Sequence, residues 1–205
     1  MWVTIRPLAH SHWLVKLAAA SVFTLLTAMA AQVDVHLAFT PVPITLQVLA
    51  VLLAGLLLGS RWGALSQVEY LTAGALGYPV FAGGAGGVQH LWGPTGGYLW
   101  GFVAAAYLVG FVVERSGRER ALMRFLASLA GVAVIYALGG AWLSFWLKGT
   151  QGIPFAESLM LAWQQGVAPF VVIDLLKGVL ATLLADGSLA LWSWLEPALP
   201  GEPHR

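Results

Sequence analysis

Two ionisable residues stand three positions apart in an apolar segment near the end of the chain, PFVVIDLLKGVLA (169–181). Asp174 and Lys177 would share one face of a helix, because residues three apart are neighbours on a helical surface. Buried among apolar residues, such charges are costly unless they pair with each other or face a cavity. The spacing therefore predicts either a self-neutralising structural pair or a binding site that combines a hydrogen-bond acceptor with a donor.

Two further polar side chains interrupt apolar segments upstream. Glu69 lies near the middle of 62–77, where it could be the counter-charge of Lys177 or face a ligand, and we favour the structural role. Gln47 lies one turn inside 43–59, with an amide that can both donate and accept. Ligand contact and hydrogen bonding between helices are equally supported for it. Both residues are candidates for the same site.

A glycine-rich stretch, FAGGAGGVQHLWGPTGGYLWGF (81–102), separates two apolar segments in the middle of the chain. Its clustered glycines are Gly83, Gly84, Gly86 and Gly87. Without a Cβ they can adopt φ > 0 and bring backbone N–H and C=O groups against a ligand, although small residues also serve close helix packing in membranes. Phe81 and Tyr98 flank the glycines and would suit the apolar part of a ligand. We expect a flexible lid that orders on binding.

The composition is that of an integral membrane protein. Of 205 residues, 59% are hydrophobic and 9% charged, whereas about a quarter of residues are charged in ordinary soluble domains. A membrane-spanning helix needs about 20 mainly apolar residues. Six segments fit, at about 13–33, 43–59, 62–77, 97–113, 121–147 and 167–195. We predict an all-α fold, a single membrane domain over residues 1–205 with six transmembrane helices in a compact bundle.

Positive charges gather on one side of this topology. The basic residues on that side are Arg6, Lys16, Arg61, Arg115, Arg118, Arg120, Arg124 and Arg205. The loops on the other side, 34–42, 78–96 and 148–166, hold only Lys148. Because cytoplasmic loops carry an excess of Lys and Arg, both termini are predicted to be cytoplasmic and loop 78–96 to face outward. A cleaved signal peptide ending at residues 28–30 is disfavoured, since the apolar run continues to Val33.

Other patterns limit partners and chemistry. Ala20, Thr24 and Ala28 recur at four-residue intervals, a small-residue stripe that permits close approach of a helix from a partner or from the same bundle. The chain has no cysteine, and its five histidines show no i, i+4 pair, so we predict neither a metal site nor a cofactor. It has no G-x-x-x-x-G-K-[ST] motif for nucleotide hydrolysis. A net charge of +1 argues against a nucleic-acid partner.

Four motifs follow one another in an order that resembles a known family. They are PVPITLQVLAVLLAGLLLG (41–59), GALGYPVFAGGAGG (74–87), GPTGGYLWGF (93–102) and PFVVIDLLKGVLA (169–181). The chain resembles the BioY family, the biotin-specific substrate-binding (S) component of energy-coupling-factor transporters. The resemblance implies biotin uptake across a bacterial or archaeal cytoplasmic membrane, alone or with a transmembrane coupling protein and two ABC-type ATPases. It also implies docking through small residues of the first helix, and it leaves a homo-oligomer open.

The resemblance also suggests a ligand for the candidate site. Biotin offers a ureido ring, with two N–H donors and one acceptor oxygen, and a carboxylate on a flexible tail. Asp174 could accept a ureido N–H, and Lys177 could donate to the ureido oxygen or to the carboxylate. Three other functions compete with this one: binding of a different vitamin, an intramembrane enzyme built on scattered ionisable residues without a Ser or Cys motif, and a purely structural subunit.

Overall fold

The computed structural model describes residues 12–116 and 121–195, with side chains up to residue 188. Its helices are α2 (Trp13–Ala31), α3 (Gln47–Leu58), α4 (Ser60–Ala75), α5 (Gly96–Ser116), α6 (Ala121–Gln151), α7 (Phe155–Gly166) and α8 (Val171–Leu195). The short strands β1 (Asp34–Val35) and β2 (Ile44–Thr45) pair antiparallel, and the 3-10 turns η1 (Ala82–Gly84) and η2 (Val88–Leu91) shape the glycine-rich loop. The predicted all-α class is confirmed.

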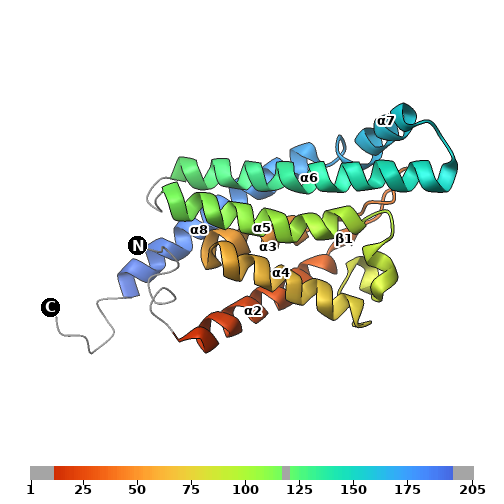
Figure 1. Ribbon diagram of the computed structural model, residues 1–205. Helices are drawn as coiled ribbons and strands as arrows, with labels where there is room; N and C mark the ends of the chain where they lie inside the picture. The colour runs from red at the N-terminus through yellow and green to blue at the C-terminus, as the bar shows by residue number, and fades with distance from the viewer. Residues whose placement is uncertain (1–11, 117–120, 196–205) are drawn as a thin grey trace.

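The helices form a bundle whose connections separate to its two ends (Figure 1). The β1–β2 hairpin, η1, η2 and α7 lie at one end. The α3–α4 turn, the end of α5 and the start of α6 lie at the other. This separation follows the predicted division between glycine-rich and basic connections, while the side that faces the cytoplasm stays a prediction.

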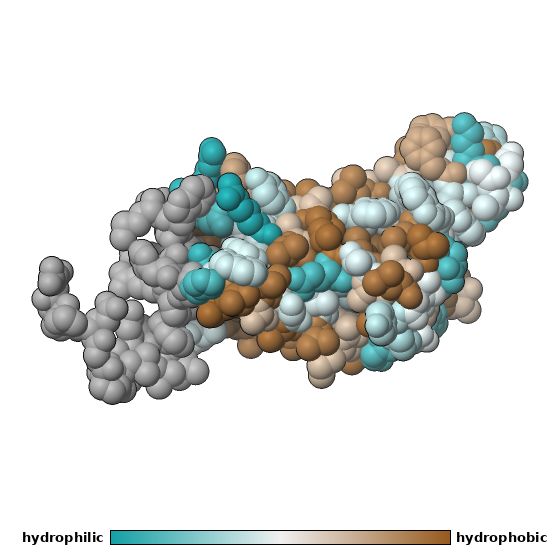
Figure 2. Space-filling view, turned by 60° about the horizontal axis from the view of Figure 1, so that its bottom comes forward, coloured by the Kyte–Doolittle hydropathy of each residue, from teal (hydrophilic) through white to brown (hydrophobic). Residues whose placement is uncertain are grey.

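The lengths of the helices support only some of the six predicted transmembrane spans. Within the described residues, α2, α5 and α6 are each long and apolar enough to cross a membrane, and α7 and α8 pass that test together as a pair bent by 52°. With 12 and 16 residues, α3 and α4 are about 18 and 24 Å long, shorter than a hydrocarbon core of about 30 Å. All six predicted helices exist, but their lengths do not establish six full spans. Figure 2 shows hydrophobic residues over much of the middle of one face.

The prediction of a loop over 148–166 was wrong, because this region contains the end of α6 and all of α7. Ser158, Ala162 and Gly166 are buried at four-residue intervals, the spacing of one helical face, and α7 packs on α6. Its other faces carry Glu157 and exposed aromatic residues. A helix of 12 residues is too short to span, so a search for long apolar windows could not find it.

The tight turn between α3 and α4 is held in place by α5. Gly59 has φ 83°, ψ −177°, a conformation that favours glycine, and it ends α3 and begins α4. The backbone N–H and the hydroxyl of Ser60 both donate to the carboxylate of Glu114, each at 2.8 Å. A carboxylate at a helix N-terminus satisfies free N–H groups and complements the helix dipole. Glu114 therefore fixes the hairpin of short helices against α5.

The α5–α6 interface is the most extensive in the bundle, and it predicts a strong effect of one substitution. A Cβ at Gly97 would clash with Cβ of Trp142 and lie 2.6 Å from the carbonyl oxygen of Leu138. We expect Gly97→Val to lower the melting temperature in detergent, since overpacking costs about 1–3 kcal/mol. Gly149→Ala is the control because nothing lies within 4 Å of a Cβ there. Equal melting temperatures of the two variants would contradict this packing.

Candidate functional site

A cavity of about 590 Å³ lies among the β1–β2 hairpin, the glycine-rich loop, α3, α5, α6 and α8. Its size falls within the range of about 300–1,000 Å³ that is usual for small-molecule sites. Much of the wall is apolar, with Val42, Phe81, Leu99, Phe102 and Phe170 among its residues. Exposed His36 and Gln89 also line it, so the cavity reaches the surface at the hairpin and loop end.

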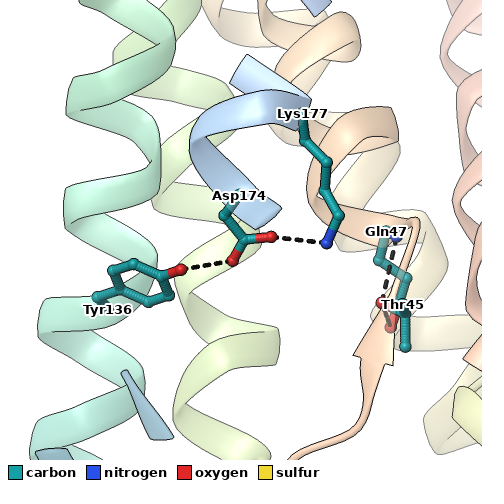
Figure 3. Close-up of polar contacts among 5 residues, drawn as sticks. All are labelled: Thr45, Gln47, Tyr136, Asp174 and Lys177. Atoms are coloured by element: carbon teal, nitrogen blue, oxygen red, sulfur yellow. Dashed lines mark hydrogen bonds and ion pairs between the residues drawn. The ribbon is translucent and has the colours of Figure 1, made fainter. Parts of the chain in front are cut away.

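Asp174 and Lys177 lie in the first two turns of α8 and both line this cavity. Lys177 Nζ donates to Asp174 Oδ1 at 2.6 Å, and the hydroxyl of Tyr136 on α6 donates to Oδ2 at 2.6 Å (Figure 3). The side chains of Asp174 and Lys177 are only 6% and 9% exposed. Each carboxylate oxygen thus has a donor, and the two charges neutralise each other.

The pair keeps hydrogen-bonding capacity for a ligand. An ammonium group has three hydrogens, and Asp174 is the only hydrogen-bond partner of Lys177 within the described residues. Each oxygen of Asp174 accepts one hydrogen bond there, although a carboxylate oxygen can accept two. The pair can therefore offer both donors and an acceptor to a molecule in the cavity. The suggested pairing of Lys177 with Glu69 was wrong, because the partner of Lys177 is Asp174.

Gln47 lines the cavity, but hydrogen bonds to neighbouring residues engage its amide. Its Oε1 accepts from the Thr45 hydroxyl at 2.9 Å, and its Nε2 donates to the Tyr70 hydroxyl at 2.7 Å. Tyr70 in turn donates to the carbonyl oxygen of Val80 at 3.1 Å. This chain of bonds connects the hairpin, α3 and α4 to the glycine-rich loop. These hydrogen bonds correspond to the link between helices that was one of its two predicted roles, and ligand contact by Gln47 stays a prediction.

The glycine-rich loop is tied to the bundle by its backbone. The Gly87 N–H donates to the Gly74 carbonyl at 2.7 Å, and Phe81 N–H donates to the Ala85 carbonyl at 2.9 Å. Gln32, just after α2, donates to the Phe81 carbonyl at 3.2 Å. Of the four predicted glycines, Gly83 lines the cavity and has φ 68°. The other three, Gly84, Gly86 and Gly87, do not line it.

The two predicted aromatic residues, Phe81 and Tyr98, both line the cavity and also contact neighbouring elements of the bundle. The ring of Phe81 packs directly on Gly74, where no side chain would fit, and meets Tyr70 edge to face with centroids 5.5 Å apart. Tyr98 donates its hydroxyl to the carbonyl of Gly166 at 2.8 Å. Tyr98 therefore joins α5 to the end of α7 while its ring faces the cavity.

The predicted docking stripe on α2 packs within the bundle. Ala20 is fully buried, Ala28 packs against the hydrophobic core, and the Thr24 hydroxyl lies 2.8 Å from Glu69 Oε2 on α4. Glu69 does not line the cavity. These contacts correspond to the packing alternative for the stripe. Glu69 has a structural contact with Thr24, and not with Lys177 as was favoured.

Several residues of the cavity escaped sequence reasoning. They include His36, Thr45, Gln89, Thr95 and Tyr136. Tyr136 is the most informative omission, because it holds Asp174 from another helix. Its one signal is a polar-tipped aromatic residue in the middle of an apolar segment, which is also typical of residues that merely pack. No group of three or more His, Cys, Asp or Glu side chains suited to a metal ion occurs in the part of the chain that the structure describes.

Breaking the buried pair should cost more than removing it. Lys177→Met leaves the Asp174 carboxylate buried with Tyr136 as its partner, and we expect a loss of about 3 kcal/mol in unfolding free energy. The double variant Asp174→Asn/Lys177→Met leaves no uncompensated charge and should recover most of that loss. Unfolding in detergent is measured for wild type, for Asp174→Asn and Lys177→Met singly, and for the double variant. Additive losses would contradict the coupling of the two side chains.

Comparison with known proteins identifies the family of this fold and site. A family model described as the BioY family matches residues 6–195. The "Probable biotin transporter BioY" of Pyrococcus horikoshii is 40% identical over 83% of this chain and 94% of its own length. The "Biotin transporter BioY" of Thermotoga maritima is also 40% identical, over 83% and 93% of the two chains.

A solved structure has the same fold. It is described as the S-component for biotin from an ECF-type ABC transporter, and it matches with a TM-score of 0.73 and 27% identity. The match covers 84% of this chain and 89% of that one. The family match, the identities to relatives from an archaeon and a bacterium, and the apolar helices agree on a multi-span membrane protein. The chain belongs to the BioY family.

Proposed function

We propose that this protein binds biotin in the cavity and delivers it inward across the cytoplasmic membrane as an S component. The observation that carries this proposal is the buried Asp174–Lys177 pair, held by Tyr136, in a largely apolar cavity of about 590 Å³. The names of the related proteins support the choice of ligand. Membership of a transporter family also favours transport over the alternative of an intramembrane enzyme.

The chemistry of the site suits a ligand with a neutral polar head and an apolar body. Asp174 would accept a ureido N–H, and Lys177 would donate to the ureido oxygen. The thiophane ring and the tail would pack against aromatic residues such as Phe81 and Phe102. Apolar walls with a few well-placed polar groups are the usual composition of small-molecule sites.

Charge balance favours one orientation of biotin. Asp174 and Lys177 already neutralise each other, so a ligand carboxylate beside them would leave two negative charges against one positive. The neutral ureido ring therefore belongs at the pair. The carboxylate would point toward the end of the cavity lined by Gln89, His90 and Thr95, where polar side chains and solvent are available.

Energy for transport would come from partners. The sequence holds no nucleotide-hydrolysis motif, so ATP-driven uptake would need a transmembrane coupling protein and two ABC-type ATPases. Function without that module is the second form of the proposal, and no cofactor is part of either form.

Calorimetric titration of the detergent-purified protein with biotin tests the ligand. Wild type should bind at one site, and Asp174→Asn should weaken binding about tenfold or more, because a hydrogen bond to a charged group contributes about 1.5–3 kcal/mol. Asp186→Asn is the matched control, since Asp186 also lies on α8 and pairs with a cation, Arg124, but does not line the cavity. No binding by folded wild type would overturn the proposal, and riboflavin and thiamine would be titrated next.

Biotin methyl ester tests the orientation separately. If the ureido ring lies at the pair, Lys177→Met should weaken binding of biotin and of its ester by a similar factor, because neither contact involves the carboxylate. If Lys177 instead held the carboxylate, the substitution would weaken binding of biotin much more than binding of the ester. Competition against labelled biotin gives both affinities.

A further inference from the structure

The interface between α2 and α4 contains a group of polar side chains separate from the cavity. Thr24 and Thr27 from α2 meet Ser66, Gln67 and Glu69 from α4, and none of the five lines the cavity. Glu69 lies nine residues into α4, about 14 Å along a helix of about 24 Å. A carboxyl group therefore sits near the middle of a predicted membrane segment without a role in the ligand site.

The Thr24 hydroxyl has more acceptor neighbours than one hydrogen can serve. Thr24 Oγ1 lies 2.8 Å from Glu69 Oε2, 2.9 Å from the Ser66 carbonyl oxygen and 3.2 Å from the Ala20 carbonyl oxygen. If Glu69 were a carboxylate, all three neighbours would be acceptors and the hydroxyl could donate to only one. Donation to Glu69 would leave two oxygens of Thr24 and Ser66 facing each other at 2.9 Å without a hydrogen between them.

A protonated Glu69 removes this conflict. Its O–H donates to Thr24 Oγ1, and the Thr24 hydroxyl then donates to the Ser66 carbonyl oxygen. Both short distances become ordinary O–H···O hydrogen bonds, for which about 2.7–2.8 Å is the most frequent length. The proton on Glu69 thus completes a continuous chain of donors from α4 to α2 and back to α4.

Neighbouring donors cannot take the place of this proton. Thr27 donates to the Phe23 carbonyl, and Ser66 donates to the Gly63 carbonyl. The Gln67 amide N–H groups point to Thr27 Oγ1 and Ser66 Oγ, while its buried Oε1 has no donor among the described residues. The interface therefore has fewer hydrogen-bond donors than acceptors, and a hydrogen on Glu69 would supply the missing donor to Thr24.

Charged partners for Glu69 are also missing from the described ion pairs, which join His36 to Asp34, Arg124 to Asp186 and Lys177 to Asp174. The titratable residues on α4 and on the elements packed against it are Lys16 on α2, Arg61 and Tyr70 on α4, Tyr98, Tyr107, Glu114 and Arg115 on α5, and His90 on η2; α3 carries none. Lys16 lies eight residues before Thr24, about 12 Å along α2. An ionised carboxyl group at this depth carries a free-energy penalty unless it is paired or faces water.

We propose that Glu69 is a proton-binding site, a neutral carboxylic acid that donates to Thr24 and fastens α2 to α4. Loss of the proton would turn Glu69 into an acceptor only and break the link to Ser66. α2 packs mainly on α3 and α4, and Val22, Leu25 and Met29 on its outer side are 53%, 64% and 67% exposed. The attachment of this peripheral helix would consequently depend on pH.

Infrared spectroscopy of the purified protein without biotin tests the protonation directly. Wild type should show the C=O stretch of a protonated carboxylic acid, and Glu69→Gln should lose it. Glu114→Gln is the matched control, because Glu114 accepts two hydrogen bonds from Ser60 and lies outside this interface. Thr24→Val should shift the band by removing its acceptor. Absence of the band in wild type, or its persistence in Glu69→Gln, would overturn the proposal.

Thermal unfolding against pH gives a second, independent measurement. The amide introduced by Glu69→Gln can donate to Thr24 at any pH, so the melting temperature of wild type should fall relative to this variant as pH rises. A constant difference across pH would contradict a titrating Glu69. Stabilisation of wild type, but not of Glu69→Gln, by sodium at fixed pH would mean that a metal cation occupies the site instead of a proton. Neither measurement depends on biotin, so their outcome is separate from that of the ligand titration.

Discussion

A lipid environment offers no hydrogen-bond partners, so each polar group within the membrane must find one inside the protein or in a cavity. The structure brings several polar groups of the apolar segments together at two places. One is the start of α8 beside the cavity, where Asp174, Lys177 and Tyr136 satisfy one another. The other is the contact between α2 and α4 around Glu69.

The two clusters differ in a way that fits separate roles. At α8, opposite charges cancel and hydrogen-bonding capacity remains on the side of the cavity. Around Glu69, there is no countercharge among the described ion pairs and the donors are all engaged. The first cluster keeps the hydrogen-bonding capacity that the proposed binding of a polar ligand requires, whereas the second closes a helix interface. Gln47 and Tyr70 combine both features, because Gln47 lines the cavity and its hydrogen bond to Tyr70 links the cavity wall to the glycine-rich loop.

Sequence reasoning was most successful where a single helix determines the outcome. The i, i+3 spacing of Asp174 and Lys177 was enough to predict a shared face, and apolar length predicted α2, α5 and α6 closely. It failed where the outcome depends on contacts between distant segments. Tyr136 contacts Asp174 across 38 positions. The partner of Glu69 is Thr24, a residue of the predicted docking stripe. The helix α7 was not predicted, because it is short and amphipathic and therefore contains no long apolar window.

The bend between α7 and α8 has a mechanical consequence for the ligand site. Pro169 lies in this break, and Asp174 and Lys177 follow within the first two turns of α8. Their charges and hydrogen-bonding atoms are therefore carried by one helix that begins at the bend. On the other side of the bend, the hydroxyl of Tyr98 donates a hydrogen bond to the carbonyl oxygen of Gly166 at the end of α7. Any change in the angle between α7 and α8 would therefore move Asp174 and Lys177 together, relative to Tyr136 on α6.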